Sequence, residues 1–268
     1  MPTLIYALGA VGYDFGSEAR RDSFVQKGLV DPSNVNSLLN FLEAHPSHAE
    51  AITWTLNQDL TPIYAILPSG PFASEVYGKL RQFMCDQTTP DGVELVSIPG
   101  WGSGKATLMS GQIVAGIVPD VRGMSEWSVA KLLEVLIGAP PTKGEALKAY
   151  TALKDGISNF LQRVYYEFRN LGVTPQERAI NFAGTNAAQA RNVFTDAIKR
   201  GLVLDKISLE QSSVCRPGSD CWDVKLMFFN PSKTSEQAKH VYRFTIDVSD
   251  VVPVTVGRTR DWDVYADN

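Results

Sequence analysis

The sequence predicts an α+β fold with a mixed or antiparallel sheet and a central helical segment. Strand and helix patterns alternate near the N-terminus, helical patterns follow one another in the middle, and consecutive strand patterns fill the C-terminal part. A parallel βαβ protein would instead alternate strands and helices throughout. Because no Pro/Ser-rich or charged linker divides the chain, we expect one domain with a strand-helix region over 1–124, a helical region over 125–201 and a strand region over 202–268.

The first region is expected to contain strands at 3–9, 51–56, 61–67, 93–98 and 113–118 and helices that begin at Ser17, Ser33 and Phe72. Gly9 and Gly12 supply only part of a dinucleotide-binding fingerprint, so we expect the segment 9–16 to be a loop that uses positive φ. The Gly-rich segment 99–107 matches neither a P-loop nor a nucleophile elbow and is expected to be a flexible connection or lid. Cys85 is expected to be a small buried residue.

Later helices are expected at Ser128–Ile137, Lys143–Asn170 and Thr174–Arg200, and strands at 202–209, 222–229, 241–248 and 252–256. Thr174, Pro175 and Glu177 form the pattern of a capping box with proline at the first helical position. From Tyr242 to Ser249 apolar and polar residues alternate, which predicts a strand with one buried and one solvated face.

Composition excludes several classes of function. The chain of 268 residues has 25 Lys and Arg against 29 Asp and Glu, a net charge of −4, whereas nucleic-acid binding requires a basic surface. The N-terminus lacks the basic start of a signal peptide, and no stretch of about 18 apolar residues could span a membrane. We therefore expect a cytoplasmic protein without a nucleic-acid or membrane partner.

Two polar groups are candidates for binding. The first contains Asp14 and the charged residues of the helix that follows, namely Glu18, Arg20, Arg21 and Asp22. Such a group is most often a solvated helix face with paired charges, and its alternative role is to bind a peptide or a partner. The second is the loop from Cys215 to Trp222, in which Arg216 could attract an acidic partner.

The two cysteines of this loop leave three states open. Reduced thiols are expected in the cytoplasm, and a disulfide across the Pro-Gly turn is geometrically allowed. The third state is a zinc site of Cys215, Cys221, Asp220 and His240. Structural zinc sites space paired cysteines about two to four residues apart, and this pair is wider. We predict no cofactor, with zinc as the alternative, and find no catalytic base beside the thiols.

Several long strings of residues carry a resemblance to a known family. They are Tyr6–Gly9, Gly12–Gly16, Glu18–Phe24, Tyr165–Glu167, Arg169–Gly172, Thr174–Ala179, Cys215–Pro217, Ser219–Lys225, Tyr242–Thr245 and Asp247–Gly257. The chain resembles the C-terminal domain of unknown function shared by the PatA and PatG type cyanobactin maturation proteases.

In that family the domain follows a subtilisin-like protease that cleaves or macrocyclises a ribosomal precursor peptide. The resemblance implies a place in cyanobactin biosynthesis and partners among the precursor peptide and the pathway enzymes. It transfers no catalytic triad to this chain. We expect an accessory, non-catalytic domain that binds peptide or enzyme, through Asp14, Glu18, Arg20, Arg21, Asp22 or Arg216 and an exposed strand edge. The alternatives are an enzyme acting on the precursor and a zinc-stabilised structural or dimerisation module.

Overall fold

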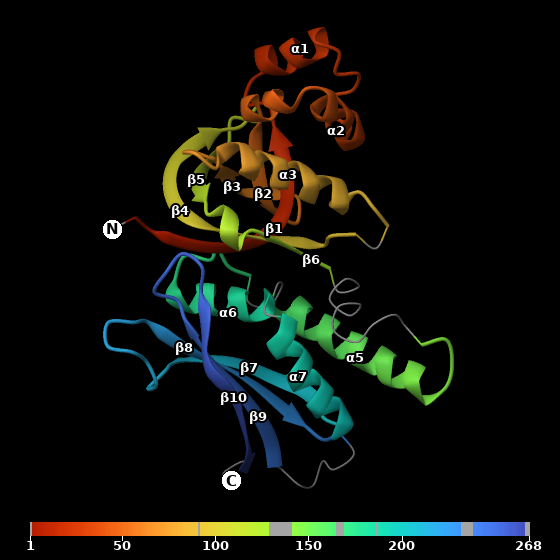
Figure 1. Cartoon of the computed structure of the whole chain (residues 1–268), viewed down its shortest axis with the longest axis vertical. Helices are drawn as coiled ribbons and strands as arrows, with labels where there is room; N and C mark the ends of the chain where they lie inside the picture. The colour runs from red at the N-terminus through yellow and green to blue at the C-terminus, as the bar shows by residue number, and fades with distance from the viewer. Residues whose placement is uncertain are drawn as a thin grey trace. The chain divides into compact units, whose positions relative to one another are not determined.

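The fold is described by a computed structural model that covers residues 2–90, 92–128, 141–164, 169–185, 187–231 and 238–265. Contacts divide the chain into two compact units, Met1–Ser128 and Val129–Asn268, and each is described by itself. The first contains a mixed sheet and the second contains helices followed by an antiparallel sheet, so the predicted α+β class is confirmed (Figure 1). The expected single domain stays a prediction, and the helix expected at Ser128–Ile137 lies outside the described residues.

Five strands of the first unit close into a small barrel. They are β1 (Leu4–Asp14), β2 (Thr53–Gln58), β3 (Thr61–Ile66), β4 (Leu95–Thr107) and β5 (Ile113–Pro119). Strand β1 pairs with β4 through its first half and with β2 through its second half, so the order β1-β2-β3-β5-β4 returns to β1. Strands β3 and β5 are parallel, the other pairs are antiparallel, and one helix separates β3 from β4. The same connectivity defines the OB fold. A short strand, β6 (Ser125–Trp127), pairs with the start of β4.

Two glycines let β1 change partners inside the barrel. Gly9 is the last residue paired with β4, and a Cβ atom there would lie 2.5 Å from the carbonyl oxygen of Asn57 on β2. At Gly12 a Cβ atom would lie 2.4 Å from the Asn57 side-chain nitrogen. The loop predicted over 9–16 is therefore wrong up to Asp14, because these glycines permit close approach of strands rather than a turn.

The Gly-rich segment 99–107 also belongs to a strand. It forms the second half of β4, which is irregular between Gly102 and Lys105 where its register against β5 shifts. A Cβ atom at Gly100 would lie 2.2 Å from the Val118 carbonyl oxygen. The expected flexible connection, with a lid as its alternative role, is thus wrong, since the segment is part of a strand and its glycines allow β4 and β5 to approach each other.

Three helices and two short 3-10 turns complete the first unit: α1 (Glu18–Gln26), α2 (Val35–Ala44), α3 (Ala73–Gln87), η1 (Pro46–Ala51) and η2 (Val121–Gly123). Ser17 caps α1 as predicted, with its side chain accepting a hydrogen bond from the Arg20 amide. Helix α3 buries the predicted face, Val76, Leu80, Phe83 and Met84. Cys85 is exposed, contrary to expectation, because it lies one position beyond this apolar stripe.

The second unit places helices on one face of an antiparallel sheet. The helices are α5 (Glu145–Gln162), α6 (Pro175–Thr185) and α7 (Ala187–Lys199), and the strands are β7 (Val203–Gln211), β8 (Cys221–Phe229), β9 (Ala238–Asp247) and β10 (Val254–Tyr265). The strand order is β10-β9-β8-β7. On the helix side, the ring of Phe194 from α7 lies 5.4 Å from Phe160 of α5 and 5.6 Å from Phe228 of β8. No helix in the described residues is long and apolar enough to cross a membrane.

The start of α6 and the end of α7 agree with the capping patterns in the sequence. The Glu177 amide donates to Thr174 Oγ1 at 3.2 Å, and the Thr174 amide donates to Glu177 Oε2 at 3.1 Å, which confirms the capping box. After α7, Gly201 has φ of 69°, its amide bonds the Ile198 carbonyl, and the Leu202 amide bonds the Ala197 carbonyl. This is a Schellman motif, which requires glycine at the left-handed position. The predicted single helix Thr174–Arg200 is two helices, α6 and α7.

The sheet of the second unit has a helix side and an outer side, which the strand register defines. Tyr242, Phe244 and Ile246 of β9 lie on the helix side and are buried as predicted. The alternate residues lie on the outer side, where Arg243 is half-buried and Thr245 is buried. The outer side is therefore less solvated along β9 than alternation alone indicates. Strand β10 runs to Tyr265, nine residues beyond the predicted end at 256.

Candidate functional site

The predicted N-terminal polar group makes local contacts at the end of β1 and on α1. Asp14 Oδ1 accepts hydrogen bonds from the amides of Gly16, at 2.6 Å, and Met109, at 2.9 Å, so it joins the β1–α1 connection to the β4–β5 loop. Arg20 Nη1 donates to the Phe15 carbonyl oxygen at 3.0 Å. Asp14 and Arg20 therefore stabilise the backbone of the β1–α1 connection.

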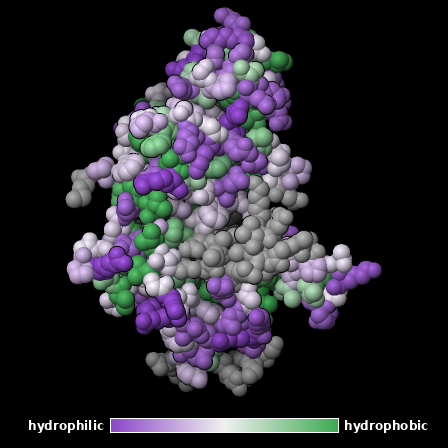
Figure 2. All heavy atoms as spheres, in the orientation of Figure 1, coloured by the Kyte–Doolittle hydropathy of each residue, from purple (hydrophilic) through white to green (hydrophobic). Residues whose placement is uncertain are grey.

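The remaining members of this group are solvated. Arg21 and Asp22 form an ion pair of 3.0 Å, and Glu18 is exposed in the first turn of α1. The surface over α1 is mostly hydrophilic (Figure 2). Neighbouring exposed charges of this kind contribute little to stability and are typical of a solvated helix face. Binding by Asp14, Glu18, Arg20, Arg21 and Asp22 stays a prediction.

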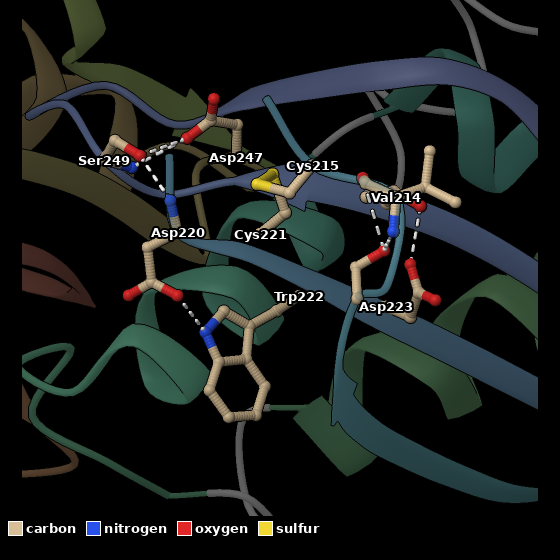
Figure 3. The surroundings of a disulfide bond; sticks show 10 residues. Val214, Cys215, Asp220, Cys221, Trp222, Asp223, Asp247 and Ser249 are labelled. Carbon is tan, nitrogen blue, oxygen red and sulfur yellow. Dashed lines mark hydrogen bonds between the residues drawn. A yellow bond between two sulfur atoms is a disulfide. The ribbon is translucent and has the colours of Figure 1, made fainter. Parts of the chain in front are cut away.

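The cysteine loop is closed by a disulfide between Cys215 and Cys221 (Figure 3). The expectation of two reduced thiols is therefore wrong. The Cα atoms lie 5.7 Å apart, because the Pro-Gly turn between them, with Gly218 at φ of 83°, folds the chain back. A disulfide leaves no thiolate, so this loop supplies neither a catalytic thiol nor a cysteine ligand for zinc.

Hydrogen bonds fix the end of the loop to β9 and the residues that follow it (Figure 3). The Asp220 amide donates to Ser249 Oγ at 2.7 Å, and the Trp222 indole nitrogen donates to Asp220 Oδ1 at 2.9 Å. Ser249 Oγ in turn donates to Asp247 at 2.6 Å. Although burial opposes ionisation, hydrogen bonds from Ser249 and Ser219 and the charge of Arg216 lower the pKa of Asp247. The loop is thus a rigid corner that starts β8.

Of the four proposed zinc ligands, His240 lies far from Cys215, Asp220 and Cys221. In the register of β8 with β9, Cys221 lies opposite Asp247, whereas His240 lies opposite Phe228 at the other end of the pair. Seven residues of extended strand separate Asp247 from His240, which is about 23 Å. Among the described residues no group of three or more His, Cys, Asp or Glu side chains could hold a metal ion.

His240 belongs instead to a network that the sequence did not reveal. It is buried, with Nδ1 2.6 Å from Asp263 Oδ1 and Nε2 3.2 Å from Asp261 Oδ2. Arg200 Nη1 lies 3.3 Å from the same Nε2. Asp261 and Asp263 are two residues apart on β10, so both carboxylates reach the helix side of the sheet. Both ring nitrogens are engaged, and the network attaches β10 to β9.

The same network continues onto α7. Arg200 Nε pairs with Asp196 Oδ2 at 3.0 Å, and Tyr242 Oη donates to that carboxylate oxygen at 2.5 Å. Burial raises the pKa of Tyr242, and the hydrogen bond to Asp196 raises it further. Tyr242 therefore stays neutral and serves as a donor that ties the sheet to the helix.

On the outer side of the sheet, three cations lie in a row across neighbouring strands. Lys225 of β8 pairs with Arg243 of β9, and Arg243 pairs with Arg260 of β10. We call Lys225, Arg243 and Arg260 the cationic row. The ring of Trp262 lies beside it, with Lys225 Nζ and Arg243 Cζ each 5.9 Å from the ring centroid. Such distances allow cation–π attraction.

The members of the cationic row differ in how they are neutralised. Lys225 forms an ion pair with Glu210 of β7. Arg243 Nη1 lies 3.3 Å from Oδ2 of Asp223, which is buried. Arg260 is exposed, and in the described part of the chain no carboxylate lies within ion-pair distance of it. Within the described residues, the row thus ends at the edge strand in a cation, Arg260, that has no ion-pair partner.

Strand β10 is the edge of this sheet. It is 12 residues long and, within the described residues, pairs with β9 alone. Val254 and Tyr265 near its two ends are 54% and 75% exposed. The other edge, β7, is shorter, and one of its carbonyls, that of Asp205, accepts a hydrogen bond of 2.8 Å from Arg163. The expected exposed strand edge is therefore best represented by β10.

Comparison with known proteins gives one consistent result. Residues 4–99 match a family model described as the PatG domain, and residues 148–262 match one described as PatG C-terminal. A solved structure titled "PatG Domain of Unknown Function" superposes with a TM-score of 0.88 at 38% sequence identity, over 98% of this chain and 100% of that chain. No curated protein matches the sequence.

Proposed function

The chain belongs to the family of PatG domains of unknown function, and from this premise we propose that it is an accessory, non-catalytic domain of cyanobactin biosynthesis. In this proposal it binds an extended segment of the precursor peptide, or of a pathway enzyme, as an additional strand along β10. Main-chain hydrogen bonds supply affinity in such strand addition, and alternate side chains supply specificity.

The length and openness of β10 carry the proposal. Proteins usually protect an edge strand by keeping it short, covering it, bulging it or placing charges on it, because an open edge pairs readily with other chains. Strand β10 carries charges and an irregular stretch between Val256 and Arg260, but it is long, and among the described residues no strand covers its outer edge. Strand β10 is 12 residues long, and both its terminal parts are exposed. The His240 network holds β10 against the rest of the sheet through Asp261 and Asp263. A fixed edge offers a bound peptide a preformed partner.

The chemistry of the candidate residues supports binding over catalysis. Cys215 and Cys221 are oxidised, and both nitrogens of His240 have partners. Nucleophilic catalysis requires an activated nucleophile beside a base, and these side chains do not supply such a pair.

Calorimetric titration with the precursor peptide tests the proposal, and we expect saturable binding. A matched pair of peptides defines the mode. The two have the same sequence but carry N-methyl groups on alternate amides, in one peptide at odd positions and in the other at even positions. Strand addition uses the amides of one edge only, so one peptide of the pair should bind and the other should not. The proposal fails if neither the precursor nor any pathway enzyme binds.

Two further readouts separate the alternatives. Mass spectrometry of the precursor after incubation with the protein should show an unchanged mass, whereas a change would favour an enzyme that acts on the peptide. An edge strand can also pair with that of a second copy. Molar mass measured by light scattering should therefore be followed with and without peptide, since a dimer through β10 would dissociate when the peptide binds.

A further inference from the structure

We propose that the strand added to β10 carries an acidic side chain directly opposite Arg260, on the outer side of the sheet. This inference rests on the proposed function and specifies the ligand that the same edge selects. It follows from the cationic row, from the absence of an ion-pair partner for Arg260 among the described residues, and from the apolar residues beside it.

The cationic row places like charges directly opposite each other. Lys225, Arg243 and Arg260 occupy one row of the register across three strands. Like charges in facing positions destabilise a sheet unless opposite charges lie nearby. Glu210 neutralises Lys225 and Asp223 neutralises Arg243, which leaves Arg260 at the open edge. A strand that pairs with β10 places one residue directly beyond Arg260, and a carboxylate there would neutralise Arg260 as Glu210 and Asp223 neutralise Lys225 and Arg243.

The neighbours of Arg260 define the rest of the pattern. Trp262 and Val264 follow at two and four residues, so their side chains lie on the same side of β10 as Arg260. Trp262 is half-buried, and Val264 is 38% exposed. Apolar side chains of a bound strand would cover both residues. The preferred ligand is therefore an extended peptide with an acidic residue and, two positions away, an apolar or aromatic residue.

The charges near the row favour an acidic peptide over a nucleic acid. The chain has a net charge of −4, and the carboxylates of Glu210 and Asp223 lie within the row's own surface. A phosphate backbone would meet these carboxylates at successive positions, and its binding depends on an extended basic surface. A single carboxylate beside Arg260 avoids them.

The test uses three 12-residue peptides of alternating Thr and Val. They differ at one position, Glu, Gln or Lys, whose side chain would lie on the outer side of the sheet when the peptide pairs with β10. Fluorescence anisotropy measures their affinity for the wild type, Arg260→Glu and Arg258→Glu. Arg258 is the matched control, because it is exposed but lies in the irregular stretch between the paired residues Val256 and Arg260. We expect the wild type to bind the Glu peptide about fivefold more tightly than the Gln peptide, as an exposed charge pair allows. Arg260→Glu should prefer the Lys peptide, and Arg258→Glu should behave like the wild type.

The outcomes separate this inference from the proposed function. If the wild type binds Glu, Gln and Lys peptides equally, strand addition stands and the acidic preference is wrong. If Arg258→Glu loses the preference as fully as Arg260→Glu does, the effect is general charge rather than register, and the inference is again wrong. Absence of binding by every peptide and by the precursor overturns both. Displacement of the Glu peptide by a single-stranded oligonucleotide would assign the row to nucleic acid instead.

Discussion

Removal of the Cys215–Cys221 disulfide should destabilise the second unit by an amount that the loop length sets. The cysteines are separated by 6 positions in the sequence, and cross-linking a loop of that size removes unfolded-state entropy equivalent to about 2.2 kcal/mol at 25 °C. A unit of about 140 residues unfolds with an entropy of about 0.3 kcal/mol/K. The double substitution of both cysteines by Ala should therefore lower the unfolding temperature by about 7 °C.

Differential scanning calorimetry measures this shift, and Cys85→Ser provides the control. Cys85 is exposed and free, so its substitution should leave the unfolding temperature unchanged. A reductant should lower the unfolding temperature of the wild type and of Cys85→Ser, but not that of the double variant. If the double variant unfolds at the wild-type temperature, the loop is held by its hydrogen bonds to Ser249 and Val248 rather than by the disulfide.

Three further predictions concern local structure in the two units. Thr174→Ala removes the capping box and should lower the free energy of unfolding by about 1 kcal/mol in urea titrations; no change would contradict the cap. Gly9→Ala should strongly destabilise the barrel, because its Cβ would lie 2.5 Å from a carbonyl oxygen, whereas Gly78→Ala, in open space on α3, should stabilise it by up to about 1 kcal/mol. The hydrogen bond from Arg122 lowers the pKa of Asp120, so its contribution is complete above the ordinary value of 3.8 and is lost as the pH falls through the lower folded value. Asp120→Asn should flatten that part of the pH–stability curve.

Local signals in the sequence were sufficient wherever one short stretch determines the structure. The capping box at Thr174, the buried face of α3 and the strands β7, β8 and β9 all depend on residues within a few positions of one another. Such signals act before tertiary packing and are read directly from the chain.

Sequence patterns whose structural role depends on a residue far away in the sequence were interpreted wrongly or not recognised. Gly9 and Gly12 look like turn residues until β2 is placed beside them, and the carbonyl of Asn57 then explains the need for glycine. Cys215 and Cys221 were expected as thiols because the cytoplasm is reducing, but the turn between them brings the sulfur atoms together. His240 was grouped with the cysteines by residue type alone, whereas the register places it at the far end of β9.

The candidate site could be predicted only in outline. An exposed edge in the final sheet was expected, but its pattern ended at 256, because Gly257 and the charged residues after it interrupt the apolar alternation. The cationic row joins Lys225, Arg243 and Arg260, which lie far apart in the sequence and become neighbours only through strand pairing. No spacing in the chain predicts that juxtaposition.

Hydrogen exchange of the protein with and without saturating precursor peptide tests strand addition most directly. Amides on the open edge of β10 have no strand partner in the described residues and should exchange rapidly in the free protein. If the peptide adds to β10, the amides of alternate residues between Val254 and Tyr265 should become protected, while α1 with Arg20 and Arg21 stays unchanged. Protection confined to α1, or none anywhere at saturation, would contradict the proposed function.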